Sequence, residues 1–445
     1  MTETVRASWR RIGHPKKVLA ALSGGADSMA LLTLLALLAE QEGFSLCAVH
    51  VDHGLRPDSA EDAAFAAAYC QSLGIPYVVK KVRCASASEQ DARQARYAAF
   101  ARVYLEQNAD VLALAHHQRD QAETVLMRLF RGSGADGLSG METLCVYFGP
   151  AGETLKLWRP LLAVPPETLR SFLIAEGISW REDATNETDA YSRNYLRRHI
   201  LPAAEERFPG AEEAVCRAAE LLRRDNDCLQ EMAERFIREN ACLTPPCRYL
   251  MRGALARLHP AIQARVLRSA LPIALSCEQT NRLLSVKPGD KVNLPGNWHI
   301  EATEERLYLL PPKEEPLPPV PLRVTPFTGS PGDGKRAQAM PGDSLPDGLT
   351  LRFREAGDRI WPLGAKGAKS LQDYLVDRKV DRPLRDHLPL LCRGREVWWV
   401  IGVGPGEQMR VRPGEPAILL RYTGVLPGEM PPKKKDSEEM TDDGK

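Results

Sequence analysis

The chain has 445 residues, of which 44% are hydrophobic and 26% are charged, and its formal net charge is +1. This length and balance predict two or three globular domains with sizeable cores. The near-neutral total excludes a uniformly basic chain, so a nucleic-acid partner would require positive charge that is concentrated in one domain or on one face.

Ten cysteines are scattered along the chain without any CxxC pair. A chain of this length needs no disulfides to fold, and its first residues, MTETVRASWRR, lack the apolar core of a secretory signal. We therefore expect reduced thiols in a cytoplasmic protein. The longest apolar run, residues 29–39, is only about half of a membrane span, so we expect no membrane partner.

Strand-like and helix-like segments alternate in the first part of the chain. Strands are predicted over 17–22, 45–54, 76–82 and 110–117, and helices between them over 27–43, 59–74 and 88–109. Helices between strands are typical of right-handed βαβ units, which build a parallel sheet covered on both faces. The predicted fold class is therefore α/β.

The rest of the chain predicts further domains. Residues 1–210 are assigned to the α/β domain and 211–310 to a mainly helical domain with short strands over 291–310. A Pro/Gly-rich linker is predicted over 311–347, a small α+β domain over 348–425, and a disordered tail over 426–445.

A stretch of small residues separates the first strand from the first helix of this pattern. It reads Ser23, Gly24, Gly25, Ala26, Asp27 and Ser28. In open parallel sheets, ligands bind at the carboxyl ends of the strands, and a helix N-terminus with adjacent glycines favours an anion. The lysine of the GxxxxGK[ST] phosphate loop is missing, which favours attack on an α-phosphate over cleavage between outer phosphates. Asp27 suits a Mg²⁺ ion beside the phosphates. A glycine turn whose Ser and Asp only cap the helix is the alternative.

A second group of polar residues follows the fourth predicted strand. His116 and His117 end that strand, and Asp120 and Glu123 lie on one face of the helix that follows. Alone, the two histidines would be ordinary hydrogen-bonded residues. Beside a phosphate loop at the same sheet edge, a role in proton transfer or charge stabilisation is favoured. The glycine-rich segment 131–140 predicts a mobile lid.

These motifs together resemble the tRNA(Ile)-lysidine synthetase family of the N-type ATP pyrophosphatase (PP-loop) superfamily. The residues that carry the resemblance are SGGxDS, VDHGLRP (51–57), the AHH and DQAET segments (115–124), RGSG (131–134), WRPLL (158–162) and 181–202. The likeness covers nearly the whole chain. It departs at Arg119, where the family often has an acidic residue before the position of Asp120.

The resemblance implies an adenine nucleotide alpha hydrolase-like domain that uses ATP and Mg²⁺. ATP would activate C2 of the wobble cytidine of a tRNA(Ile) with a CAU anticodon, and the amine of free L-lysine would then displace AMP to give lysidine. The catalytic residues would be Asp27, His116, His117, Asp120 and Glu123. The ATP site would comprise Ser23, Gly24, Gly25, Ala26, Asp27, Ser28, Val49 and Asp52, with Asp27 also at the metal.

The resemblance also implies contacts with tRNA. They would come from Arg131, Arg193, Asn194, Arg197, Arg359, Lys369, Arg378 and Lys379. Residues 348–423 hold a modest excess of Lys and Arg over Asp and Glu. This domain could present a basic stripe to an acceptor stem, although a solvated surface of mixed charge is the alternative. We expect tRNA, lysine and a second copy of the chain, in a homodimer, as partners.

Two other functions fit parts of the pattern. A tRNA thiolase of the same superfamily would normally carry CxxC pairs for sulfur or an iron–sulfur cluster, and the chain has none. A nucleotide-dependent RNA-binding module without turnover is favoured only by Arg119.

Overall fold

The computed structural model describes residues 1–52, 59–82, 89–149, 152–182, 192–243, 248–312, 322–424, 426–427 and 429. The VDHGLRP motif from position 53 onward and nearly all of the predicted tail lie outside the described residues. The chain divides into two compact units, Met1–Asp227 and Cys228–Lys445.

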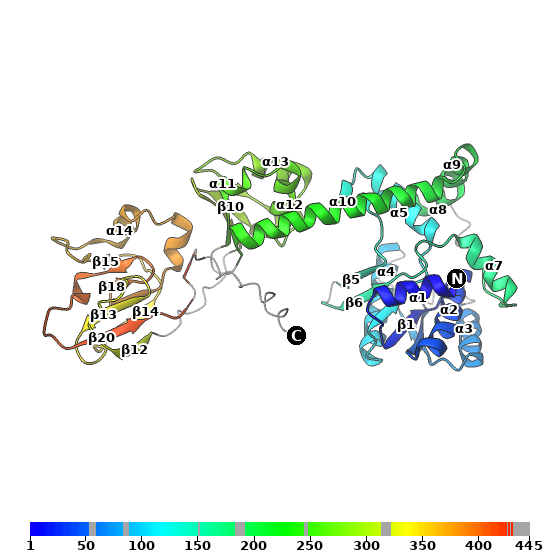
Figure 1. The fold of residues 1–445 in the computed structure, drawn as a ribbon, viewed down its shortest axis with the longest axis horizontal. Coiled ribbons are helices and arrows are strands. Elements are labelled where there is room, and N and C mark those ends of the chain that lie inside the picture. Colours follow the sequence, from blue (N-terminus) through cyan, green and yellow to red (C-terminus); the bar gives the residue numbers. More distant parts are fainter. Residues whose placement is uncertain are drawn as a thin grey trace, which may run out of the picture. The chain divides into compact units, whose positions relative to one another are not determined.

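The first unit is built on a six-stranded sheet (Figure 1). Its strands are β1 (Lys17–Ala21), β2 (Ser45–Asp52), β3 (Tyr77–Lys81), β4 (Val111–Ala113), β5 (Leu144–Phe148) and β6 (Thr154–Trp158). The order is β3-β2-β1-β4-β6-β5, with parallel pairing throughout except for the antiparallel pair β5 and β6. The predicted α/β fold with a parallel sheet is confirmed.

Helices cover both faces of this sheet. The helices of the unit are α1 (Thr2–Arg11), α2 (Ala26–Glu42), α3 (Ser59–Ser72), α4 (Glu89–Glu106), α5 (Gln118–Phe130), α6 (Ala135–Leu138), α7 (Pro166–Ala175), α8 (Ser192–Tyr195), a π-helix (Leu196–Ile200) and α9 (Leu201–Arg207). One core cluster packs α1, α2, α3 and α7 against the sheet, and a second packs α4 against the opposite face. The carboxyl ends of β1 and β4 therefore meet at one edge, where α2 and α5 begin.

Helix α1 and the β5–β6 hairpin are among the elements of this unit that were not predicted. The N-terminal segment forms α1, in which Val5 and Trp9 are buried while most of its other residues are charged or polar. Two buried residues spaced four apart suffice for one helix face, but they give a weak apolar signal. The hairpin β5–β6 alternates exposed and buried residues over only five positions in each strand, and its edge strand remains half exposed.

The second unit begins within a long helix. Its first part comprises α10 (Ala211–Asn240), α11 (Arg252–Leu255), α12 (Pro260–Ala270) and α13 (Cys277–Leu284) with β7 (Ala241–Cys242), β8 (Arg248–Met251), β9 (Lys291–Asn293), β10 (His299–Ala302) and β11 (Arg306–Leu310). The five strands form one sheet in the order β7-β8-β11-β10-β9, packed against α12 and α13. The sequence predicted strands over 291–310 but not β7 and β8, which are very short.

The C-terminal part consists of two further sheets. Its elements are β12 (Arg323–Pro326), β13 (Ala337–Pro341), β14 (Leu349–Arg352), β15 (Arg359–Ile360), β16 (Lys369–Ser370), α14 (Leu371–Asp377), β17 (Leu390–Arg393), β18 (Glu396–Val400), β19 (Gly404–Pro405) and β20 (Ala417–Arg421). A three-stranded sheet, β12-β20-β13, shares a core with the sheet that contains β17 and β18.

This arrangement corrects the predicted linker. Segment 311–347 was expected to connect domains, but β12 and β13 lie within it and pair with β20 on both sides. Of the prolines and glycines that suggested a linker, only Pro326 and Pro341 fall inside these two strands. No helix in the described part of the chain is long and apolar enough to cross a membrane.

Candidate active site

The loop after β1 leaves the first turn of α2 without a side-chain cap. Gly24 adopts a left-handed φ of +90°, and Gly25 is the N-cap residue, which has no side chain to accept a backbone hydrogen bond. The buried Ser28 hydroxyl donates to the Gly25 carbonyl at 2.9 Å and lies 3.1 Å from the Ser23 hydroxyl. The two serines therefore shape the loop rather than cap the helix, which disfavours the simple capping alternative and leaves N–H groups for an anion.

The end of β2 lies beside this loop. The Leu22 amide donates to the Val49 carbonyl at 2.9 Å, and the His50 ring nitrogen Nδ1 lies 2.9 Å from the Leu22 carbonyl. The Val49 side chain is fully buried in the core on the α4 face, and Asp52 is also buried. Val49 can therefore meet a nucleotide only through its backbone, and His50, which the sequence did not single out, fixes the loop.

His117 is the N-cap residue of α5. Its ring Nδ1 accepts from the Asp120 amide at 3.4 Å, while its own amide donates to the Asp120 carboxylate at 3.1 Å. This reciprocal arrangement is a capping box with histidine in the first position. Because Nδ1 accepts, the ring proton lies on Nε2.

The Nε2 atom of His117 lies between the carboxylates that follow β1 and β4. It lies 3.4 Å from Asp27 Oδ2 and 3.5 Å from Asp120 Oδ2. Burial alone would lower the pKa of His117, but the hydrogen bond that its ring donates to Asp27 and the charge of Asp120 outweigh burial and raise that pKa above its ordinary value. The pKa of Asp120 is lowered, since the neighbouring His117 and His116 outweigh the opposing effect of burial. Because Nδ1 accepts from the Asp120 amide, the ring proton on Nε2 is the one that lies between the two carboxylates.

Two arginines form ion pairs with the carboxylates of α5. Arg197 Nε lies 2.6 Å from Glu123 Oε1, and Arg197 Nη2 lies 3.1 Å from Asp120 Oδ1. Arg193 Nη2 donates to the Thr124 hydroxyl at 2.9 Å, and Arg193 Nε lies 3.2 Å from Glu123 Oε2. The side chain of Glu123 is fully buried. Charged contacts therefore run without a break from Asp27 through α5 to the segment 193–197.

His116 differs from His117 in its hydrogen bonding and in the direction of its pKa shift. Its Nδ1 is buried and forms no hydrogen bond to any described residue. Burial lowers its pKa to about 4, and although Asp120 opposes this shift, the positive charges of Arg159 and Arg193 add to it. His116 is therefore neutral at physiological pH.

Arg119 faces away from this site. Its Nη2 lies 2.5 Å from Glu167 on α7, and its Nε lies 2.8 Å from Glu212 on α10. The residue that departs from the family pattern thus ties the start of α5 to two other helices and leaves Asp120 in place.

The glycine-rich segment predicted as a lid is anchored by three side chains that the sequence analysis missed. Arg128 donates to the carbonyls of Gly137 and Gly140, both at 2.8 Å. Gln121 exchanges two hydrogen bonds with the backbone of Met141, and Arg223 of α10 donates to the same Met141 carbonyl at 2.6 Å. Gln121 lies within the DQAET motif, so its position beside the site residues was the available signal.

The remaining predicted residues are distributed over both units. Arg131 is exposed at the end of α5, and Asn194 lies on α8 between the arginines described above. In the C-terminal part, Lys369 Nζ and the Arg378 guanidinium lie 5.5 and 5.4 Å from the centre of the Tyr374 ring. Arg359 and Lys379 are exposed nearby in sequence, on β15 and just after α14.

Comparisons with known proteins identify the family of the chain. A family model described as the PP-loop domain matches residues 2–204, and one described as the TilS substrate C-terminal domain matches residues 349–422. The chain is 32% identical to the tRNA(Ile)-lysidine synthase of Geobacter sulfurreducens, over 91% of this chain and 92% of that protein. It is 34% identical to that of Symbiobacterium thermophilum, over 87% and 89%. The chain belongs to the tRNA(Ile)-lysidine synthase family.

The two family models cover the first and last parts of the order of elements. The PP-loop match spans the six-stranded sheet and the candidate active site, and the C-terminal match spans β14 to β20. Among solved structures, the chain is similar to the U34-tRNA thiolase NcsA from Methanococcus maripaludis with its [4Fe-4S] cluster, with 23% identity, a TM-score of 0.40, and coverage of 50% of this chain and 78% of that one.

Proposed function

We propose that the chain attaches L-lysine to C2 of the wobble cytidine in a tRNA(Ile) with a CAU anticodon, by way of an adenylated cytidine. The product is lysidine, which changes the codon and amino-acid identity of the tRNA from methionine to isoleucine. The observation that carries this proposal is the junction of Asp27, His117 and Asp120, which links an uncapped helix N-terminus to the ion-paired face of α5.

ATP fits the edge of the sheet at residues 23–28. The free N–H groups of the first turn of α2 and the positive end of that helix suit the outer two phosphates. Release of pyrophosphate as one unit agrees with a loop that lacks the lysine of the common phosphate loop.

Asp27 is the residue that we assign to Mg²⁺. Its side chain is 40% exposed and lies at the edge of the phosphate loop. Among the described residues, no three His, Cys, Asp or Glu side chains gather closely enough to hold a metal by themselves. This agrees with Mg²⁺, which commonly takes one or two carboxylates and completes its shell with phosphate oxygens and water. When bound, the ion would neutralise charge on the phosphates.

The two histidines can serve different steps. The Nε2–H group of His117, fixed by Asp27 and Asp120, can donate to an oxygen of the α-phosphate and so stabilise the negative charge that develops there as pyrophosphate leaves. A neutral His116 can exchange hydrogen bonds with the nucleobase without adding charge to the site. With a pKa near 4, His116 is a weak base, so we do not assign the amine proton to it.

Asp120 is the carboxylate best placed to receive the lysine amine. Its lowered pKa keeps Asp120 charged, so it suits the lysine ammonium, and the proton that the amine must lose before attack needs another acceptor such as a phosphate oxygen. Glu123 is fully buried and contacts both Arg193 and Arg197. We therefore assign Glu123 to holding these arginines, which would in turn bind phosphates of the RNA or of the adenylate.

Discrimination between CAU-bearing tRNAs is assigned to the second unit. A methionine tRNA carries the same anticodon, so the anticodon site cannot separate the two. The cations around Tyr374 offer phosphate contacts outside the active site. Homodimer formation and placement in the cytoplasm remain predictions.

Release of AMP tests the proposed reaction. Purified protein, ATP labelled at the α-phosphate and a CAU-bearing tRNA(Ile) transcript are incubated with and without lysine. We expect AMP to accumulate only when tRNA and lysine are both present. AMP formation that ignores lysine, or iron and labile sulfide in the purified protein, would instead favour a thiolase.

A further inference from the structure

Arg119 joins the first turn of α5 to two other helices. Its Nη2 lies 2.5 Å from Glu167 Oε1 on α7, and its Nε lies 2.8 Å from Glu212 Oε1 on α10. The side chain of Glu167 is 65% exposed, whereas that of Glu212 is only 14% exposed. Because an ion pair gains more where water is partly excluded, the pair with Glu212 is the one that holds Arg119 more firmly.

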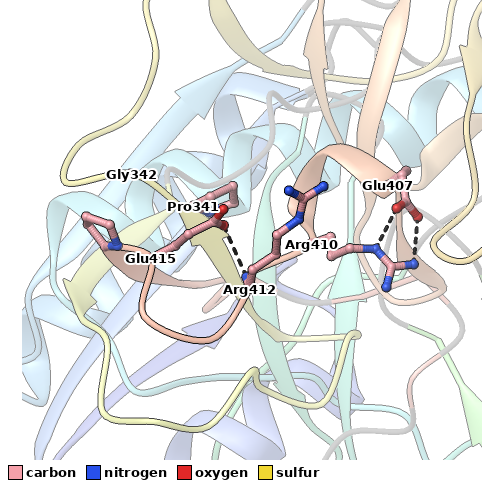
Figure 2. Close-up of a pocket in the computed structure, with 7 residues that line it drawn as sticks. Pro341, Gly342, Glu407, Arg410, Arg412 and Glu415 are labelled. Atoms are coloured by element: carbon pink, nitrogen blue, oxygen red, sulfur yellow. Dashed lines mark hydrogen bonds and ion pairs between the residues drawn. The ribbon is translucent and has the colours of Figure 1, made fainter.

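An arginine that spans helices in this way differs from one that pairs within a single turn. In a pocket of the C-terminal part, Arg410 binds both carboxylate oxygens of Glu407, three residues earlier, at 2.5 and 3.0 Å (Figure 2). On α10, Arg217 pairs with Glu213, four residues earlier. Such pairs stabilise the turn that contains them, but they do not fix one helix against another.

Further hydrogen bonds support the contact between α5 and α10. The thiol of Cys216 on α10 donates to the carbonyl of Gln118, the residue before Arg119, at 3.3 Å. The start of α10 is itself fixed, because the Glu205 carboxylate accepts from the Glu212 amide at 3.2 Å. Arg119 therefore pairs with a carboxylate whose backbone is held in place, and the first turn of α5 is docked on α10 through two successive residues.

The same turn of α5 carries two of the residues assigned to catalysis. His117 is the N-cap residue of the helix, and Asp120 follows Arg119 directly. The Nε2 atom of His117 lies 3.4 Å from the Asp27 carboxylate, which belongs to the loop after β1. This contact between two loops depends on where α5 begins. A displacement of reacting groups by about 1 Å can lower a catalytic rate about 100-fold.

We propose that Arg119 is a positioning residue, which holds the first turn of α5 against α10 and so keeps the catalytic groups of that turn in reach of Asp27. The inference rests on the proposed function, because it takes these groups as the site of that reaction. Related proteins often carry an acidic residue at this position, but here a carboxylate would stand beside those of Glu167 and Glu212 and be repelled by both. Arg119 thus matches the acidic neighbours of this chain.

Restoring an acidic residue at this position tests the assignment by the sign of its effect. The full-length Arg119→Asp variant is assayed for AMP release from ATP with a CAU-bearing tRNA(Ile) transcript and lysine. We expect kcat to fall about 10-fold, because the new carboxylate is repelled by Glu212 and shifts the start of α5. The Michaelis constant for ATP should stay within about twofold, since ATP is assigned to residues 23–28 on another loop. If the chain instead lacks a useful carboxylate, kcat should rise.

A second substitution separates positioning from a general loss of stability. Adding Glu212→Arg to Arg119→Asp restores a pair of opposite charges between the two helices, and most of the lost kcat should return. Arg217→Asp makes the same change of charge at an exposed position of α10 and is the matched control. It should leave kcat within about twofold of wild type. Urea unfolding of each variant verifies that folded proteins are compared.

Three results would overturn the inference. They are an Arg119→Asp variant as active as wild type or more active, a double variant no more active than the single one, and an equal loss of kcat in the Arg217→Asp control. If Arg119→Asp does not fold, Glu212→Gln and Glu167→Gln replace it. The first should then lower kcat more than the second, and equal effects would contradict the assignment. Failure of the proposed reaction would be seen separately, as wild-type protein that binds tRNA but releases no AMP.

Discussion

Asp27 and His117 show how individual side chains define the candidate site. The sequence predicted that both lie at the same edge of the sheet, and the structure brings His117 Nε2 within 3.4 Å of the Asp27 carboxylate. The pairing of Glu123 with two arginines could not be predicted, because Arg193 and Arg197 lie some 70 positions away along the chain and their contacts depend on tertiary packing. For the same reason, the sequence could not predict the contact of Arg223, which lies on another helix, with the backbone of residues 139–141.

Replacement of Asp27 tests its assigned role. Because its side chain is partly exposed and, among the described residues, forms an ion pair only with His117, at 3.4 Å, we expect Asp27→Asn to leave the unfolding temperature within a few degrees of wild type. AMP formation should fall at least about 100-fold, since the carboxylate is assigned to the metal and the phosphates. The exposed Asp225→Asn on α10 is the control. Near-normal turnover in Asp27→Asn would remove this residue from catalysis.

The low pKa of His116 predicts a specific dependence of stability on pH. The folded state keeps His116 neutral down to about pH 4, whereas its ordinary pKa is 6.5. Between these values the unfolded chain binds more protons, so the free energy of unfolding decreases as pH falls through this window.

The matched measurement compares wild type with His116→Asn. From pH 7 to pH 4.5, wild type should lose about 2 kcal/mol more unfolding free energy than the variant, after allowance for solvent screening. Urea titrations at several pH values give this difference. Parallel curves for the two proteins would contradict a depressed pKa at His116.

At the scale of elements, the sequence predicted the strands and helices that bear the chemistry. The predicted strand at 17–22 and helix at 27–43 correspond to β1 and α2, because clear apolar runs and glycine stops mark both. The β5–β6 hairpin and β12 were missed because short, half-exposed strands show little alternation of apolar and polar residues. Proline-rich sequence around β13 was interpreted as a linker, since the strand partner that covers it, β20, lies far along the chain.

The 131–141 segment allows a prediction with a matched control. Gly140 has a φ of +69°, and an added Cβ would lie 2.7 Å from the Gln121 amide nitrogen that binds Met141. Gly134 has an ordinary φ of −77° and open space around an added Cβ. We expect Gly140→Ala to lower the unfolding free energy by about 1–3 kcal/mol and Gly134→Ala to change it little. Urea unfolding and proteolysis of the segment measure both, and equal effects would contradict the anchoring described above.

At the scale of the whole molecule, we assign different roles to the two units. The first holds the sheet edge at which ATP is assigned, and the second contains the match to the TilS substrate C-terminal domain. The near-zero net charge of the chain agrees with this division, because tRNA affinity then has to come from local groups of cations. The family was recognisable from motifs that span both units, although the boundary between the units, inside α10, was not.

The cations around Tyr374 provide a test at this scale. Replacing both Lys369 and Arg378 by Gln should weaken tRNA binding and reduce the salt dependence of binding by about one unit of slope for each lost phosphate contact. The Michaelis constant for ATP should not change, because ATP is assigned to the first unit. Arg393→Gln, at an exposed position of β17, is the control. An unchanged salt slope would exclude these two residues from phosphate contact.

The mass of the wobble nucleoside tests the central claim most directly. A CAU-bearing tRNA(Ile) transcript is incubated with the protein, ATP and lysine labelled with heavy isotopes, then digested to nucleosides and analysed by mass spectrometry. We predict one cytidine per tRNA, at the wobble position, heavier by lysine less one water, and no such product from a methionine tRNA. An unmodified wobble cytidine after AMP has been released, or a cytidine that has gained sulfur, would contradict the assignment.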